Sequence, residues 1–85
     1  MKNIAAAIAT HSAHDLADAL AEAGVSTTRD DTKCVIPGYG TVRFDDLAEC
    51  PCWVVTVVDR VWIFDLFFYD CEMAKEMVAV AKQIS

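Results

Sequence analysis

The chain has 85 residues, and its 13 acidic and 7 basic side chains give a formal net charge of −6. A chain of this length holds one domain. If it were divided into two domains, each would have about 40 residues, a size at which folds usually need disulfides, metals or oligomerisation for stability. The negative charge opposes a phosphate backbone, so we expect no direct binding of nucleic acid. Apolar residues make up 55% of the chain, against the usual roughly 45–50%. This excess predicts a dense core or an apolar surface shared with a partner.

Neither a secretory signal nor a membrane helix is expected. The apolar stretch at residues 4–9 is mostly Ala and shorter than a signal peptide requires. No apolar run approaches the ~20 residues that cross a bilayer. We therefore expect a cytoplasmic protein without membrane contact, whose four cysteines are reduced thiols.

The first 23 residues predict two helices rather than one. They are rich in Ala, Ile and Leu and end before Gly24, a typical helix C-cap. In one straight helix, however, the early isoleucines and the later leucines would face different sides. Ser12 and Asp15 together resemble a helix start, as N-cap and first-turn acid. We expect a short helix near 3–10, a break, and a second helix over 13–23.

A polar loop is expected at 26–32, followed by a first β-hairpin. Residues 33–36 and 41–44 contain β-branched and aromatic residues and flank the pair Pro37-Gly38. Proline and glycine suit the two central positions of a type II turn. The pattern therefore predicts two antiparallel strands joined by this turn.

A second hairpin is predicted from 52–58 and 61–69, with Asp59 and Arg60 as its turn. Asp-Arg is not a favoured two-residue turn, so the register stays open. Residues 45–49, between the hairpins, are expected to form one helical turn.

A final helix is expected to follow Asp70 as its cap, with an apolar stripe formed by Met73, Met77, Val80, Ala81 and Ile84. The whole order predicts an α+β fold in one domain over residues 1–85. We expect a four-stranded antiparallel sheet made of two hairpins. An N-terminal helix or broken helix and the C-terminal helix would pack mainly on one face.

The two faces of the second hairpin carry different predictions. One is expected to form the core beneath the helices, and it contains Trp53, Val55, Val57, Trp62, Phe64, Leu66 and Phe68. The other is apolar around one carboxylate, and it contains Val54, Thr56, Val58, Val61, Ile63, Asp65, Phe67 and Tyr69. With helices on one side only, this second face would need a second subunit, a partner or a covering loop.

No residue pattern predicts a metal, a cofactor or a catalytic centre. Cys50 and Cys52 are separated by one residue, whereas paired zinc ligands are usually two to four residues apart. The segment Ser12-Ala13-His14-Asp15 contains the residue types of a nucleophilic site, but helix-start chemistry explains it better. We therefore expect a protein that is not an enzyme. A thiol or metal protein built on the cysteine pair is a weaker alternative.

The carboxylates and one tyrosine are candidates for protein binding. Asp15, Asp18 and Glu22 fall within about 60° on the second helix, which is either a solvated face or a docking surface for Lys and Arg. Tyr39 at the tip of the first hairpin is either an ordinary turn residue or a binding anchor. The full set of predicted protein-binding residues is Asp15, Asp18, Glu22, Tyr39, Asp45, Asp46, Ile63, Asp65, Phe67 and Tyr69.

These features favour a small acidic protein-binding module that occupies a basic surface of a target protein. An inhibitor or immunity-type protein has these properties, for example a phage-encoded, anti-CRISPR-like blocker of a nucleic-acid-binding bacterial defence complex. A homodimer through the sheet face is compatible with this hypothesis. The alternative is a homo-oligomeric protein that sequesters a small ligand on its aromatic sheet face.

Overall fold

The computed structural model describes residues 3–46 and 49–84 of the chain. Its elements are α1 (Ile4–Ala9), α2 (Ala13–Glu22), β1 (Thr28–Asp30), β2 (Lys33–Ile36), β3 (Gly40–Asp45), β4 (Cys52–Val58), β5 (Ile63–Phe68) and α3 (Asp70–Ile84). The strands form one antiparallel sheet in the order β1-β2-β3-β4-β5. The predicted α+β class with an antiparallel sheet and a helix at each end is confirmed, but the sheet has five strands instead of four.

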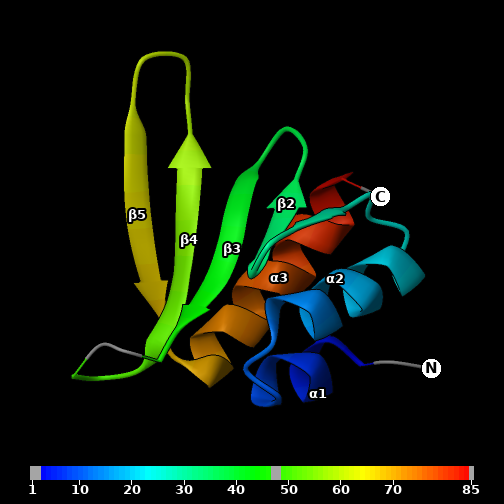
Figure 1. Ribbon diagram of the computed structural model, residues 1–85. Coiled ribbons are helices and arrows are strands. Elements are labelled where there is room, and N and C mark those ends of the chain that lie inside the picture. Colours follow the sequence, from blue (N-terminus) through cyan, green and yellow to red (C-terminus); the bar gives the residue numbers. More distant parts are fainter. Residues whose placement is uncertain (1–2, 47–48, 85) are drawn as a thin grey trace.

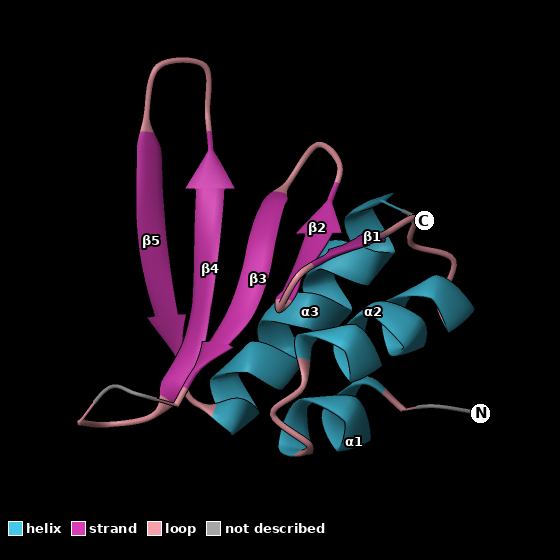
Figure 2. Cartoon of the chain, viewed as in Figure 1, coloured by secondary structure: helices cyan, strands magenta, loops and turns pink. Residues whose placement is uncertain are grey.

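The three helices form a layer on one side of the sheet (Figure 1). The helix α2 contacts β1, β2 and β3, and α3 contacts β4 and β5, whereas the far end of the β4–β5 hairpin extends past the helices (Figure 2). Within residues 3–46 and 49–84, no helix combines the length and the apolar character needed to span a membrane.

The break between α1 and α2 is confirmed and has a local cause. Ser12 is the N-cap of α2, and its side-chain oxygen accepts a hydrogen bond from the backbone N–H of Asp15 at 3.3 Å. His11 has a φ of +58°, a left-handed conformation that ends α1 and reverses the chain. Gly24, with a φ of +92°, follows the C-cap of α2. The break lets Ile8 and the leucines of α2 reach one core.

The predicted first hairpin is also confirmed. Tyr39 donates its backbone N–H to the carbonyl oxygen of Ile36 at 3.0 Å, and Gly38 between them has a φ of +81°. Positive φ at this position is the signature of a type II turn, with Pro37 before it.

The polar loop predicted at 26–32 is wrong, because β1 lies within it. All three residues of β1 are exposed, so the segment lacks the apolar alternation that identifies a half-buried strand. Its order comes from pairing with β2 and from an ion pair between Arg29 and Asp18 of α2. These contacts depend on the tertiary fold and not on local sequence.

The second hairpin has a longer turn than predicted. Val58 lies opposite Ile63, and Asp59 donates its N–H to the carbonyl oxygen of Trp62 at 2.8 Å, so residues 59–62 form the turn. The predicted two-residue turn and the strand start at 61 are therefore wrong. A shift of two residues leaves the faces of the strands unchanged, because side chains alternate with a period of two.

The helical turn expected at 45–49 is not found at its first residue, since Asp45 belongs to β3. Leu47 and Ala48 lie outside the described residues. At the start of α3, Asp70 is already helical, in the first turn and not at the cap.

The core lies between the helix layer and β2, β3 and β4. Its largest fully buried side chains include Trp53 of β4, which meets leucines of α2 and methionines of α3 in one cluster. The predicted α3 stripe is buried at Met73, Met77, Val80 and Ala81, whereas Ile84 is 44% exposed.

Three residues predicted to belong to this core are exposed. Trp62, Phe64 and Leu66 are 70%, 45% and 36% exposed, because the upper part of the β4–β5 hairpin extends beyond the helices. On β5, Phe68 is the residue that packs against the core. Conversely, Val54 was expected on the open face yet is fully buried there, between its cross-strand neighbours Arg43 and Phe67.

We predict that Gly40→Ala destabilises the protein far more than Gly38→Ala. A Cβ at Gly40 would overlap the backbone carbonyl of Thr56 on β4, whereas a Cβ at Gly38 would have no described atom within 4 Å apart from its chain neighbours. The first change should cost about 3 kcal/mol through overpacking, and the second about 1 kcal/mol through its positive φ alone. Urea denaturation of both variants measures the difference. Equal losses would contradict the close approach of β3 and β4.

Candidate functional site

Most of the exposed apolar side chains gather on one element, the β4–β5 hairpin with the residue that follows it. We call this set the hairpin surface, and it consists of Val58, Val61, Trp62, Ile63, Phe64, Leu66, Phe67 and Tyr69. Large apolar side chains scattered singly are ordinary, but a contiguous group of this kind marks an interaction site.

The hairpin surface is exposed on both sides of the sheet. Ile63 and Phe67 lie on the face away from the helices, and they are 73% and 64% exposed. Phe64 and Leu66 lie on the helix side, and they are nevertheless 45% and 36% exposed. A partner that covers all four must therefore contact both faces of β5.

The strand β5 also forms an edge of the sheet, because β4 is its one neighbour in the described sheet. Hydrogen bonds in an antiparallel ladder alternate along each strand, and Asp59 and Trp62 already form a bonded pair at the turn. The alternation directs Phe64, Leu66 and Phe68 toward β4. The backbone groups of Ile63, Asp65 and Phe67 then point outward from the edge, where an added strand would find them.

The area of the hairpin surface is large for a protein of this size. With roughly 150–250 Å² for each large side chain, the exposed fractions amount to on the order of 900 Å². The largest apolar patch on a typical monomer is roughly 300–600 Å². One side of a standard protein–protein interface buries about 800 Å². This area is divided between the two faces of the sheet, so it equals one side of a standard interface only for a partner that contacts both faces.

The charges around the hairpin surface are mainly negative. Asp65 lies in the middle of β5, where its carboxylate accepts a hydrogen bond from the hydroxyl of Thr56 at 2.7 Å. Asp59 is in the turn, and Asp70 and Glu72 open α3 at the other end of the strand. The turn also carries one exposed cation, Arg60. A partner with apolar groups and a basic rim would match this distribution.

The structure brings four of the predicted binding residues together, namely Ile63, Asp65, Phe67 and Tyr69. All four are exposed and lie on or next to β5. The sequence pattern assigned Trp62, Phe64 and Leu66 to the core and thereby missed them as surface residues. The available signal was the length of the apolar run, which exceeds what one terminal helix can cover.

The predicted carboxylates of α2 lie at a separate place. Asp18 forms an ion pair with Arg29 of β1, so it is partly neutralised within the chain. Asp15 lies in the first turn of α2, where the helix dipole favours a negative charge. These contacts support the fold, and they leave α2 less suited than the hairpin surface to a partner.

Tyr39 is not an exposed anchor at the hairpin tip. It is half-buried, packs against the core, and donates its hydroxyl to the Glu76 carboxylate of α3 at 2.7 Å. Burial raises the pKa of Tyr39 above its usual value. The hydrogen bond to Glu76 and the negative charge of Glu76 raise the pKa of Tyr39 further. The side chain fastens the first hairpin to α3.

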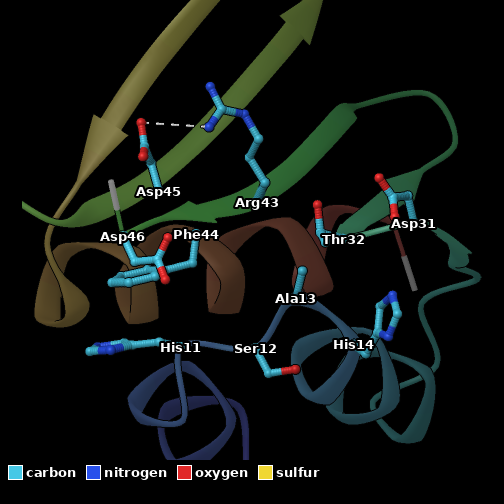
Figure 3. Close-up of a pocket in the computed structure, with 10 residues that line it drawn as sticks. All are labelled: His11, Ser12, Ala13, His14, Asp31, Thr32, Arg43, Phe44, Asp45 and Asp46. Carbon is cyan, nitrogen blue, oxygen red and sulfur yellow. Dashed lines mark ion pairs between the residues drawn. The ribbon is translucent and has the colours of Figure 1, made fainter. Parts of the chain in front are cut away.

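A cleft of about 490 Å³ opens where the α1–α2 connection faces β3 (Figure 3). It is lined by His11, Ser12, Ala13, His14, Asp31, Thr32, Arg43, Phe44, Asp45 and Asp46. It contains two predicted residues, of which Asp45 lies 3.7 Å from the Arg43 guanidinium and Asp46 is exposed.

His11 in this cleft is held by two contacts. Its ring stacks on Phe44 with centroids 4.0 Å apart, and its Nε2 lies 2.9 Å from the Asp70 carboxylate at the start of α3. The pair joins the helix break to α3 and β3. His14 Nε2 is buried, and within the described residues it has no hydrogen-bond partner. The cleft shares no residue with the hairpin surface.

The thiols differ in exposure. Cys34 is fully buried, and burial raises its pKa to about 11 even though the nearby Arg29 opposes the shift. Cys50 and Cys71 are exposed, and Cys52 is half-buried on β4. Across residues 3–46 and 49–84, no three His, Cys, Asp or Glu side chains lie close enough to hold a metal ion together.

Comparison with known proteins finds no family model, no curated sequence and no solved structure that matches this chain.

We predict that the two tryptophans report opposite environments. Trp53 is fully buried, and Trp62 is 70% exposed at the hairpin tip. In dilute protein, iodide should quench Trp62 in a Trp53→Phe variant several times more strongly than Trp53 in a Trp62→Phe variant. Within the described residues the Trp53 indole N–H has no partner, so its replacement by Phe removes no hydrogen bond. Weak quenching of Trp62 would mean that the tip is covered within the monomer.

Proposed function

We propose that this chain is a non-enzymatic protein-binding module that acts through its hairpin surface. The observation that carries the proposal is the exposed apolar area on β5 and its turn, which summed over both faces of the sheet is about that of one side of a standard interface. An inhibitor or immunity-type protein acts by covering a surface of its target. Such a protein needs a binding surface of this kind and no catalytic site.

The partner that fits is a protein with a basic surface around an apolar centre. The formal charge of −6 steers the chain toward such a surface and away from nucleic acid. Asp59, Asp65 and Asp70 around the hairpin surface would meet the basic rim. In this proposal the apolar centre contributes most of the binding free energy, and the charged rim raises the association rate.

The proposal predicts that Phe67→Lys weakens target binding and Val78→Lys does not. Phe67 is central in the hairpin surface, whereas Val78 is an apolar residue of α3 with 41% exposure outside that surface. Tagged wild type and both variants would be used to isolate partners from the native host. The wild type and Val78→Lys should retain the same protein, and Phe67→Lys should bind it at least about tenfold more weakly.

The association rate with the isolated partner should fall as salt rises, since exposed opposite charges are screened over roughly 8–10 Å. Retention of the partner by Phe67→Lys would contradict the hairpin surface as the site. A rate that does not change with salt would contradict the basic rim.

A further inference from the structure

We propose that the free protein covers its edge with a second copy of itself, by antiparallel pairing of β5 with β5 across a two-fold axis. The inference rests on the hairpin surface used in the proposed function, but not on the partner proposed there. The two sheets would join edge to edge, with both helix layers on the same side. The target and the second copy would then compete for β5.

The exposure of β5 on both faces favours an approach from the edge. A protein lying on either face of the sheet would cover Ile63 and Phe67, or Phe64 and Leu66, but not both pairs. A strand added beside β5 contacts both faces at once, and it also pairs the outward N–H and C=O groups.

A second β5 has the properties that this edge requires. An added strand must itself be apolar on both faces, because its side chains will flank those of β5 on each side. Among the strands of the described residues, β5 is the one that exposes apolar side chains on both faces. A two-fold interface places the same patch on both copies, so a self-complementary strand suffices.

Charge selects the register of the pairing. A two-fold axis at Asp65 would place the two Asp65 carboxylates directly opposite each other, which is destabilising. An axis at Leu66 instead places Leu66 opposite Leu66, Phe64 opposite Phe68, and Asp65 opposite Phe67. The residues with outward backbone groups still face one another in this register. We assign the axis to Leu66.

The antiparallel arrangement also aligns the ends of the two strands favourably. The hairpin turn of one copy lies beside the strand end of the other, where α3 begins. The turn carries Arg60, and the first turn of α3 carries Asp70 and Glu72. Arg60 of each copy thus lies toward the acidic helix start of its partner, but Asp59 beside it leaves the turn without net charge, so the pairing depends on its apolar contacts.

Sedimentation of the full chain tests the pairing. We expect a species of twice 9.3 kDa whose fraction grows as the concentration rises from about 1 to about 500 µM. In Leu66→Arg two guanidinium groups would meet at the axis, and the dimer should weaken at least about tenfold. The control Val78→Arg adds the same charge on α3 and should sediment as the wild type does. A wild type that remains monomeric at the highest concentration, or equal weakening by both variants, would overturn the proposal.

A second variant covers the case in which Leu66→Arg fails to fold. Asp65→Asn keeps an oxygen for the Thr56 hydroxyl and removes a negative charge next to the axis. It should dimerise several-fold more tightly than the wild type. An unchanged or weaker dimer would contradict the pairing of β5 with β5.

Salt separates this inference from the proposed function. Two copies of net charge −6 repel each other, so screening should strengthen the dimer between about 50 and about 500 mM NaCl. Binding to a basic target should weaken over the same range. A dimer that dissociates as salt rises would contradict pairing through an apolar edge, whereas failure to find a basic target would leave the dimer standing.

Discussion

The helix layer of this protein is narrower than its sheet, and the exposed surface follows from that mismatch. The helices bury the inner faces of β2, β3 and the lower part of β4, where Trp53 anchors the core. Beyond that limit, β4 is the one strand beside β5 among the described residues, and the far end of β5 extends past the helices (Figure 2). The sequence nevertheless makes β5 one of its most apolar segments. Burying it requires a surface from outside the monomer, since the alternative leaves on the order of 900 Å² of apolar area in water.

Local sequence patterns correctly predicted those elements that depend on interactions between neighbouring residues. Ser12 as N-cap and the type II turn at Pro37-Gly38 are both set by side-chain and backbone rules within four residues. The short strand β1 could not be predicted, because its order comes from pairing with β2 and from Arg29 reaching Asp18. Alternation correctly assigned the two faces of β5, but it says nothing about how far a helix layer extends. For that reason Phe64 and Leu66 were placed in the core, and the candidate site was only half predicted.

The charge and the apolar surface have separate roles in this account. A net charge of −6 opposes nonspecific association between copies of a chain with so much exposed apolar area. Asp65 adds a local restraint, since a carboxylate within an edge strand disfavours pairing in the wrong register. Its bond to Thr56 fixes the carboxylate on the open face. The carboxylate would thus limit which strands can pair with the edge of β5. The cleft beside His11 is a separate feature at the helix break.

The central claim is that the outer edge of β5 is an interface, and amide hydrogen exchange at single-residue resolution tests it most directly. The outward amides of Ile63, Asp65 and Phe67 should exchange rapidly in dilute protein and become protected as the concentration rises. Exchange at the exposed strand β1, on the opposite edge of the sheet, should stay unchanged and serves as the internal reference. Protection that grows only at β5 is the predicted result. Exchange at β5 that remains as fast as an open edge strand at every concentration would contradict the account.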